Sequence, residues 1–544
     1  MQTAFSPTYT QKDLLLNKSD QIVTIQDFQR LLQTGLHSLN TGQFENAKQA
    51  VNNALSINPD STQANFLAGL VENALNNHSE ALKSFSNVLK YDPKNCAVWV
   101  HIADLKSGFG EFSEAEKALE KAVEYDDGSP NLKQMVGLVN SKLMKYQDAL
   151  DWYQKATHQQ PNNIGFLLNQ ATCLMYLGKI DEAEEVLVSI IKIQPAIASA
   201  HWLLSGLRKT KDQQHVTQMK SLMQSFCFTP NDLAYFHYAC GKEYEDLEQW
   251  DEAFNSFTAA AASKRTSIKY DESLEQEMYD YLLATCTEEW LKDGPDGYPD
   301  ESPIFIIGEP RSGTSLVEHI ISAHSQISSA GELKNLLYCI NQLSNTVGEH
   351  DLTPQLAMRA TNCEPFLLGE AYMNSVKRVR GNTAHFVDKL PSNFLFLPLI
   401  LKILPKAKII HLRRDPMDTC FSGFKQLFTQ AYAYSYDQSE IARHHARYLY
   451  MMEAWRTRFG KRFLEIKYEE LAMNFEINAH KIIEYLELDW DDNCLRFFEQ
   501  STPVSTASSV QVRQPVNTKS IGRWRKYENH LQPMVQELNK HQPK

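Results

Sequence analysis

The sequence predicts an α + α/β fold class, in which an α-helical repeat array is followed by a three-layer α/β domain with a mostly parallel sheet. Two observations predict it. The first half repeats small residues and turn residues at a fixed spacing, and the second half twice shows an apolar strand that leads through a turn into a helix. The length of 544 residues is enough for roughly two to four domains.

Three columns of residues carry the repeat. Alanines recur every 34 residues, at Ala47, Ala81, Ala115, Ala149 and Ala183. Twelve residues after each lies a turn residue (Pro59, Pro93, Asp127, Pro161 and Pro195), and twelve before each lies a small residue (Gly35, Gly69, Ala103, Gly137 and Ala171). Small residues let two antiparallel helices approach closely, and proline ends the second helix. A period of this kind is the tetratricopeptide pattern.

Gly241 and Ala253 repeat the same offset, so we expect the array to span 23–265, after a flexible N-terminus at 1–22. Such an array is a superhelix with a concave face. We expect this face to bind a protein or peptide, and the alternative is a purely architectural stalk or dimerisation element. A helical linker is predicted over 266–300, ending in a loop rich in turn residues, and the α/β domain over 301–544.

The α/β domain opens on a P-loop-like motif. Pro303 to Ile307 predict a buried strand, and Leu316 to Ala323 predict a helix. The loop between them, Gly308-Glu309-Pro310-Arg311-Ser312-Gly313-Thr314-Ser315, would aim backbone N–H groups at an anion. Thr314 stands where a nucleotidase needs lysine, which speaks against ATP hydrolysis. Arg311 instead offers a bidentate fork suited to a terminal phosphate.

A second anion site is predicted around Arg414. Lys408 to Leu412 predict another strand, which leads into the turn and a further helix. Arg414 lies at the end of this strand, and Ser422 lies about two turns into the helix, so their side chains can converge on one phosphate. Two phosphate sites on one α/β sheet indicate a nucleotide that is phosphorylated at both ends.

These residues resemble the sulfotransferase superfamily, which uses 3′-phosphoadenosine 5′-phosphosulfate (PAPS) as donor. Within it, the C-terminal half resembles tyrosylprotein sulfotransferases, and the whole architecture resembles tetratricopeptide-repeat sulfotransferases. The resemblance covers about residues 300–530. It rests on the loop around Arg311, the Arg414 and Ser422 pair, and four further elements: Gly331-Glu332, Lys389-Leu390-Pro391, Ser508 to Asn517, and Arg523-Trp524 with Tyr468.

The resemblance implies a role for each element. Glu332 is the general base for the acceptor hydroxyl, and Lys389 and Ser508 stabilise the leaving group. The 5′-phosphosulfate is held by Arg311, Ser312, Gly313, Thr314 and Ser315. The 3′-phosphate is held by Arg414, Ser422 and Arg523, and Tyr468 contacts the nucleotide. We expect no metal.

The amino-acid composition limits the classes of partner and site that we expect. Fifty-four Lys and Arg residues against 66 Asp and Glu residues give a net charge of −12, which argues against general nucleic-acid binding. Nine scattered cysteines without a C-x-x-C pair indicate neither a disulfide framework nor a zinc site. No secretory signal or membrane anchor is apparent, so we expect a cytoplasmic protein. The adjacent His444 and His445 point to different helix faces, and we expect them at the solvated surface.

The leading hypothesis is a PAPS-dependent sulfotransferase that acts on a hydroxyl, with the repeats recruiting a protein or other macromolecular acceptor. A rival from another class is a repeat scaffold whose transferase domain binds nucleotide without turnover. A third hypothesis, a kinase or NTPase on a P-loop fold, is disfavoured by Thr314 in the lysine position.

Overall fold

The computed structural model describes residues 25–346, 352–428, 431–500, 502–506 and 509–541. The N-terminus predicted to be flexible (1–22) and Ser508 lie outside these ranges. The chain forms two compact units, Met1–Phe166 and Leu167–Lys544, and each is described by itself below. The predicted repeat array spans this division.

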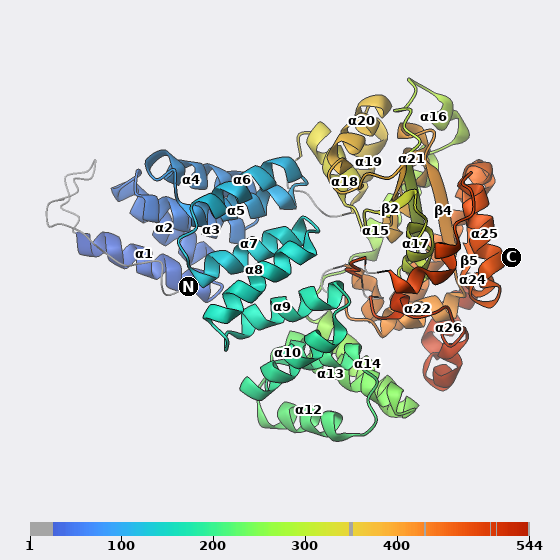
Figure 1. The fold of residues 1–544 in the computed structure, drawn as a ribbon, viewed down its shortest axis with the longest axis horizontal. Coiled ribbons are helices and arrows are strands. Elements are labelled where there is room, and N and C mark those ends of the chain that lie inside the picture. Colours follow the sequence, from blue (N-terminus) through green and yellow to red (C-terminus); the bar gives the residue numbers. More distant parts are fainter. Residues whose placement is uncertain (1–24, 347–351, 429–430, 501, 507–508, 542–544) are drawn as a thin grey trace. The chain divides into compact units, whose positions relative to one another are not determined.

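The first unit is a stack of helical hairpins (Figure 1). Its helices are α1 (Ile25–Asn40), α2 (Phe44–Ile57), α3 (Thr62–Ala74), α4 (His78–Tyr91), α5 (Cys96–Gly108), α6 (Phe112–Glu124), α7 (Pro130–Lys142) and α8 (Tyr146–Gln159). Ser61, Asn95 and Ser129 cap α3, α5 and α7 with side-chain oxygens that accept backbone N–H bonds. The alanines of the 34-residue column are fully buried, as the repeat pattern predicts.

The small-residue column lies where the two helices of a hairpin cross. A Cβ placed on Gly69 would lie 2.3 Å from the ring of Phe85, and one on Gly137 would lie 2.6 Å from the ring of Tyr153. In both hairpins the large residue comes sixteen positions after the glycine. Each ring therefore fills the space that a side chain on the facing helix would need, which explains the period.

Replacing Gly69 with alanine is expected to destabilise the first unit, although alanine favours a helix by about 1 kcal/mol over glycine. The new methyl group would collide with the buried Phe85 ring, and overpacking costs about 1–3 kcal/mol. Gly108→Ala is the matched control, since nothing lies within 4 Å of that position. Thermal unfolding of both variants tests this, and a Gly69→Ala chain as stable as the control would contradict it.

The second unit begins with further helices. They are α9 (Ile164–Tyr176, which crosses the division), α10 (Ile180–Ile193), α11 (Ala198–Leu207), α12 (Gln214–Ser225), α13 (Pro230–Asp246), α14 (Trp250–Arg265), α15 (Glu272–Thr285) and α16 (Glu288–Lys292). A Cβ on Gly241 of α13 would lie 2.5 Å from the ring of Phe257 on α14. The α13–α14 pair therefore repeats the hairpin geometry of the first unit.

A five-stranded sheet forms the centre of the α/β part. Its order is β2 (Ile327–Ser329), β3 (His385–Asp388), β1 (Pro303–Gly308), β4 (Lys408–Arg413) and β5 (Leu464–Lys467), and all pairs are parallel. The central strand β1 is buried along its whole length, as a parallel sheet covered on both faces requires. The predicted fold class is confirmed, and in the described residues the sheet is entirely parallel.

Helices cover both faces of the sheet. On one face, α17 (Thr314–Ser322) and α25 (Phe475–Tyr485) pack against Ile304, Ile306 and Ile410. On the other, Tyr372 contacts Phe305 and Tyr448 contacts His411. The remaining elements are α18 (Asn335–Leu343), α19 (Pro354–Asn362), α20 (Pro365–Val376), η1 (Pro391–Phe394), α21 (Leu397–Ile403), α22 (Pro416–Phe424), η2 (Ala433–Tyr436), α23 (Gln438–Phe459), η3 (Gly460–Arg462), α24 (Tyr468–Met473), η4 (Asp492–Glu499), η5 (Gln511–Arg513), η6 (Arg523–His530) and α26 (Gln532–Lys540).

The last hairpin of the array and the α/β part share one hydrophobic core. Phe254 and Phe257 of α14 belong to the same buried cluster as Phe421 of α22, Tyr527 of η6 and Met534 of α26. The hydroxyl of Tyr238 on α13 donates to the backbone carbonyl of Phe424 at 3.2 Å. Because apolar side chains of α13 and α14 are buried in this cluster, both helices are part of the second unit's core. Within the described ranges, no helix combines the length and the apolar character needed to span a bilayer.

Candidate functional site

The loop between β1 and α17 has the strained backbone of an anion cradle. The backbone φ angles are 149° at Gly308, 70° at Arg311 and 109° at Gly313, all in a region that side chains disfavour. A Cβ on Gly313 would lie 2.6 Å from the Tyr468 ring, so glycine is required there for space as well. The hydroxyl of Ser312 is buried and has no hydrogen-bond partner among the described residues. The loop thus offers an unsatisfied polar group beside the N-terminus of α17.

One cavity of about 2200 Å³ gathers most of the predicted site residues. Its walls include Arg311, Gly313, Thr314, Ser315, Glu332, Arg414, Ser422, Tyr468 and Arg523. Ser312 and Lys389 are buried and do not line it, while Ser508 lies outside the described residues. Thr506 and Ser509, which lie close to Ser508 in the sequence, do line the cavity. The hydroxyls of Thr506 and Ser315 lie 3.3 Å apart. The structure therefore brings nine of the twelve predicted residues to one cavity.

Arg414 ties three segments of this cavity together. Its guanidinium donates to the carbonyl of Arg311 at 2.9 Å and to the carbonyl of Ser520 at 2.7 Å, and it stacks on the Tyr468 ring at 4.6 Å. Its Nε is buried without a partner among the described residues. Ser422 accepts a 3.4 Å hydrogen bond from Nε of Arg311, so the two predicted phosphate sites are adjacent.

The cavity concentrates positive charge. Burial, together with the neighbouring charge of Arg414, lowers the pKa of Arg311 to about 10. Arg311 and Arg414 thus bring two guanidinium groups to one cavity, an arrangement that an anionic ligand would stabilise.

Glu332 and Lys389 form an ion pair at the edge of the cavity. The Lys389 ammonium, which is completely buried, contacts Glu332 Oε1 and lies 3.7 Å from Glu318 Oε2. Burial by itself would lower the pKa of Lys389, but the two carboxylates outweigh it and raise the pKa. Glu332 is 39% exposed at its side chain, so it is the member of this pair that faces the cavity.

Arg523 reaches the cavity from η6 and pairs with a carboxylate of the repeat helix α13. Its Nε donates to Glu245 Oε1 at 3.2 Å. The same oxygen accepts from Lys425 Nζ at 2.6 Å and from the Tyr527 hydroxyl at 2.9 Å. Lys425 also lines the cavity, although it belongs to none of the predicted motifs.

Four charged residues near the site were missed from the sequence. Glu318 lies on α17, and Lys425 is the C-cap that directly follows α22, so helical spacing from Thr314 and Ser422 could have indicated them. Asp388 immediately precedes Lys389, and burial raises its pKa to about 7 although the Tyr372 hydroxyl donates to it. Glu245 carried no local signal, because its partners lie 180 and 278 residues away.

The expectation that His444 and His445 are solvated is wrong. Both are buried, because α23 is packed on most of its circumference there. His444 contacts Glu275 of α15 and lies 3.2 Å from Glu309 of the loop. Burial opposes its charge, yet these carboxylates outweigh it and raise the pKa of His444 to about 9. Burial lowers the pKa of His445 to about 4, so this ring stays neutral.

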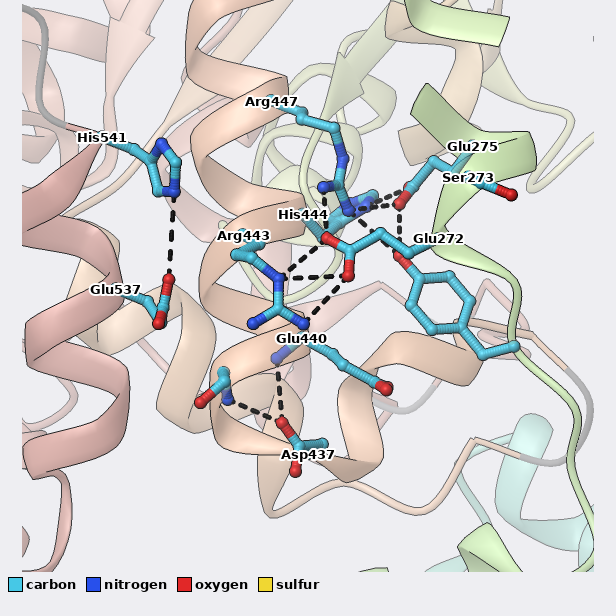
Figure 2. A network of polar contacts seen from close by, with 12 residues as sticks. Glu272, Ser273, Glu275, Asp437, Glu440, Arg443, His444, Arg447, Glu537 and His541 are labelled. Carbon is cyan, nitrogen blue, oxygen red and sulfur yellow. Dashed lines mark hydrogen bonds and ion pairs between the residues drawn. The ribbon is translucent and has the colours of Figure 1, made fainter. Parts of the chain in front are cut away.

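His444 belongs to a polar network between α15 and α23 (Figure 2). Arg443 makes a bidentate contact with Glu272 at 2.9 Å, and Arg447 bonds Glu272 at 2.5 Å and Glu275 at 2.6 Å. Because His444 lies between Glu275 and Glu309, the predicted linker helix is joined through one imidazole to the anion loop.

Comparison with known families places both halves of the chain. A model described as Sulfotransferase family matches residues 303–492. Two models described as Tetratricopeptide repeat match residues 32–95 and 72–138. A further model, described as Anaphase-promoting complex, cyclosome, subunit 3, matches residues 110–190. The first match includes the anion loop, Glu332, Lys389, Arg414 and Ser422.

Individual relatives match different shares of the chain. An uncharacterized protein of Aquifex aeolicus is 28% identical over 432 residues, which cover 78% of this chain and 56% of that protein. Protein-tyrosine sulfotransferase A of Caenorhabditis elegans is 25% identical over 243 residues, which cover 42% of this chain and 63% of that enzyme. The matches thus span less than two thirds of either relative.

Among solved structures, the sulfotransferase domain from the Synechococcus PCC 7002 olefin synthase is 20% identical with a TM-score of 0.31, covering 46% of this chain and 98% of that one. The family models and the fold together establish the two halves. The chain carries tetratricopeptide repeats in its N-terminal half, and its C-terminal half contains a domain that belongs to the sulfotransferase family.

Proposed function

We propose that the C-terminal domain transfers a sulfuryl group from PAPS to a hydroxyl acceptor, and that the repeats recruit a protein or other macromolecular acceptor. One observation carries the proposal: the Glu332–Lys389 ion pair lies at the same cavity as the anion loop and the guanidinium of Arg414. A carboxylate beside a cation-rich cradle provides the two kinds of group that sulfuryl transfer requires, a proton acceptor and a site for an anionic donor.

The residues present fit a nucleotide with anionic groups at both ends. The buried Ser312 hydroxyl and Arg414 Nε both lack partners among the described residues, and Arg414 also lines the cavity. Arg311, Ser312, Gly313, Thr314 and Ser315 would hold the 5′ end, and Arg414, Ser422 and Arg523 the 3′-phosphate, with Tyr468 against the nucleotide. The donor, when bound, supplies the sulfuryl group.

Glu332 would remove the proton of the acceptor hydroxyl, because its carboxylate is the exposed member of the ion pair. The Lys389 ammonium contacts this carboxylate and holds it in place. Lys389 would also stabilise negative charge on the leaving oxygen, with Ser508 assisting. Residues of the repeat helices α9, α11 and α13 also line the cavity, among them Thr172, Trp202 and Tyr235. An acceptor brought in by the repeats could therefore meet the site directly.

Nucleotide binding by the full-length chain tests the donor assignment. We expect 3′-phosphoadenosine 5′-phosphate to raise the unfolding temperature, and adenosine 5′-phosphate and ATP to have smaller effects. A ligand at a hundred times its dissociation constant stabilises by about 2.7 kcal/mol, which is readily measured. Arg414→Ala should abolish the preference. Arg413→Ala is the matched control, since Arg413 is half-exposed and lies 3.9 Å from Glu465, away from the cavity.

Equal stabilisation by ATP, or none by any nucleotide, would overturn the donor assignment. Selective binding without transfer to any hydroxyl acceptor would favour the rival hypothesis of a repeat scaffold with an inactive transferase domain.

A further inference from the structure

The inner face of α22 presents more than the predicted serine. Asp418, Phe421 and Ser422 of α22 line the cavity, and so does Lys425, the C-cap residue that directly follows the helix. Lys425 follows Ser422 by three residues, so the two side chains are neighbours on one face. The Lys425 side chain therefore lines the same cavity as the hydroxyl already assigned to a phosphate.

Lys425 is held by a carboxylate from the repeat array. Its Nζ lies 2.6 Å from Glu245 Oε1, and only 18% of its side chain is exposed. Glu245 is buried on α13 and holds Arg523 at 3.2 Å through the same oxygen. Tyr527 donates to this oxygen as well, which fixes its position. One carboxylate oxygen thus gathers two cations whose side chains both reach the cavity.

The charges do not cancel within this group. Glu245 brings one negative charge to Lys425 and Arg523, and Arg311 adds a further positive charge nearby. Glu245 occupies only Nε of Arg523, and among the described residues no hydrogen bond engages its two terminal nitrogens. The guanidinium group of Arg523 and the ammonium group of Lys425 are therefore held together at the cavity. Their combined charge with Glu245 is positive, which favours binding of a phosphate dianion.

We propose that Lys425 is a further phosphate-binding residue of the nucleotide site, and that Glu245 is a positioning residue through which the repeat helix α13 holds Lys425 and Arg523 in place. The inference rests on the proposed function, because it assigns a nucleotide to the cavity. It also makes the last repeat hairpin a structural part of the donor site.

Calorimetric titration of the full-length chain with 3′-phosphoadenosine 5′-phosphate and with adenosine 5′-phosphate tests Lys425. We expect Lys425→Met to weaken binding of the bisphosphate about tenfold, the size of one charge-assisted hydrogen bond, and to change binding of the monophosphate by less than about threefold. Lys292→Met is the control, since Lys292 is 75% exposed and lies outside the cavity. An unchanged ratio of the two affinities in Lys425→Met would overturn the assignment.

The Glu245→Gln variant tests the positioning role of Glu245. This test remains possible if the Lys425→Met variant fails to fold. The charged or titratable groups facing Lys425 are Glu245, Arg311, Arg523 and Tyr527. Burial already lowers the pKa of Lys425, and Glu245 opposes that effect. Without the carboxylate the ammonium should lose its proton more easily, so bisphosphate affinity should fall with rising pH at a lower pH than in the wild type.

A parallel pH dependence in Glu245→Gln and wild type would overturn the positioning role, because a purely structural contact would not shift the profile. Failure of the proposed function has a different signature: the unaltered chain would then show no preference for the bisphosphate at all.

Discussion

Replacing Glu332 with glutamine is expected to abolish measurable sulfuryl transfer while nucleotide binding survives. The amide keeps the size of the carboxylate but cannot accept the hydroxyl proton, and loss of a general base costs about 10²- to 10⁴-fold in rate. Nucleotide affinity should change by less than about threefold, because Glu332 contacts Lys389 rather than the loop or Arg414. Transfer of radiolabelled sulfate from PAPS to peptide, polysaccharide and small phenolic acceptors provides the measurement.

Glu301→Gln is the matched control, since its side chain is 76% exposed and lies outside the cavity. If Glu332→Gln kept more than a tenth of the wild-type rate on an acceptor identified with the wild type, another group would have to be the base.

Removing the buried ammonium of Lys389 is expected to cause the largest loss of stability. Lys389→Met leaves the carboxylate of Glu318 in the interior, where, among the described residues, only the Ser329 hydroxyl would still donate to it, at 2.7 Å. Breaking a buried ion pair from one side costs about 3–5 kcal/mol, because the remaining charge is uncompensated. We expect this loss in chemical unfolding of the second unit, with Lys406→Met, at an exposed lysine, as the control.

The loss of stability in Lys389→Met should depend on pH. Burial raises the pKa of Glu318, while Lys389 lowers it, so removing the lysine raises this pKa further. The folded variant then binds more protons than the unfolded chain above the ordinary glutamate pKa, and its stability falls as pH rises through that window. The variant should therefore be closer to wild type at about pH 5 than at about pH 8, and adding Glu318→Gln should restore stability at the higher pH. An equal loss at both values would show that packing, rather than charge, is responsible.

The sequence revealed the parts of the fold that repeat or that turn sharply. The 34-residue alanine column could be predicted because the same position, such as Ala81, is fully buried in each hairpin. The anion loop could be predicted because its backbone has positive φ angles at Gly308 and Gly313, a conformation that favours glycine.

Contacts between segments that are distant in the sequence could not be predicted from a local pattern. Glu245 looked like an ordinary helix glutamate, because helical spacing does not reveal that Arg523 and Lys425 would meet it. His444 was misjudged for the same reason: periodicity within α23 does not show that α15 covers the helix on its outer side.

The shared core of α13, α14, α22 and α26 constrains how such a chain can evolve. Repeat proteins commonly gain and lose whole hairpins, since each hairpin contacts only its neighbours. Here an insertion or deletion between α13 and the end of α14 would carry Glu245 and Phe254 out of register with Arg523 and Tyr527. The last hairpin has thereby lost the modular freedom of its array, and it must be inherited together with the α/β domain that it helps to build.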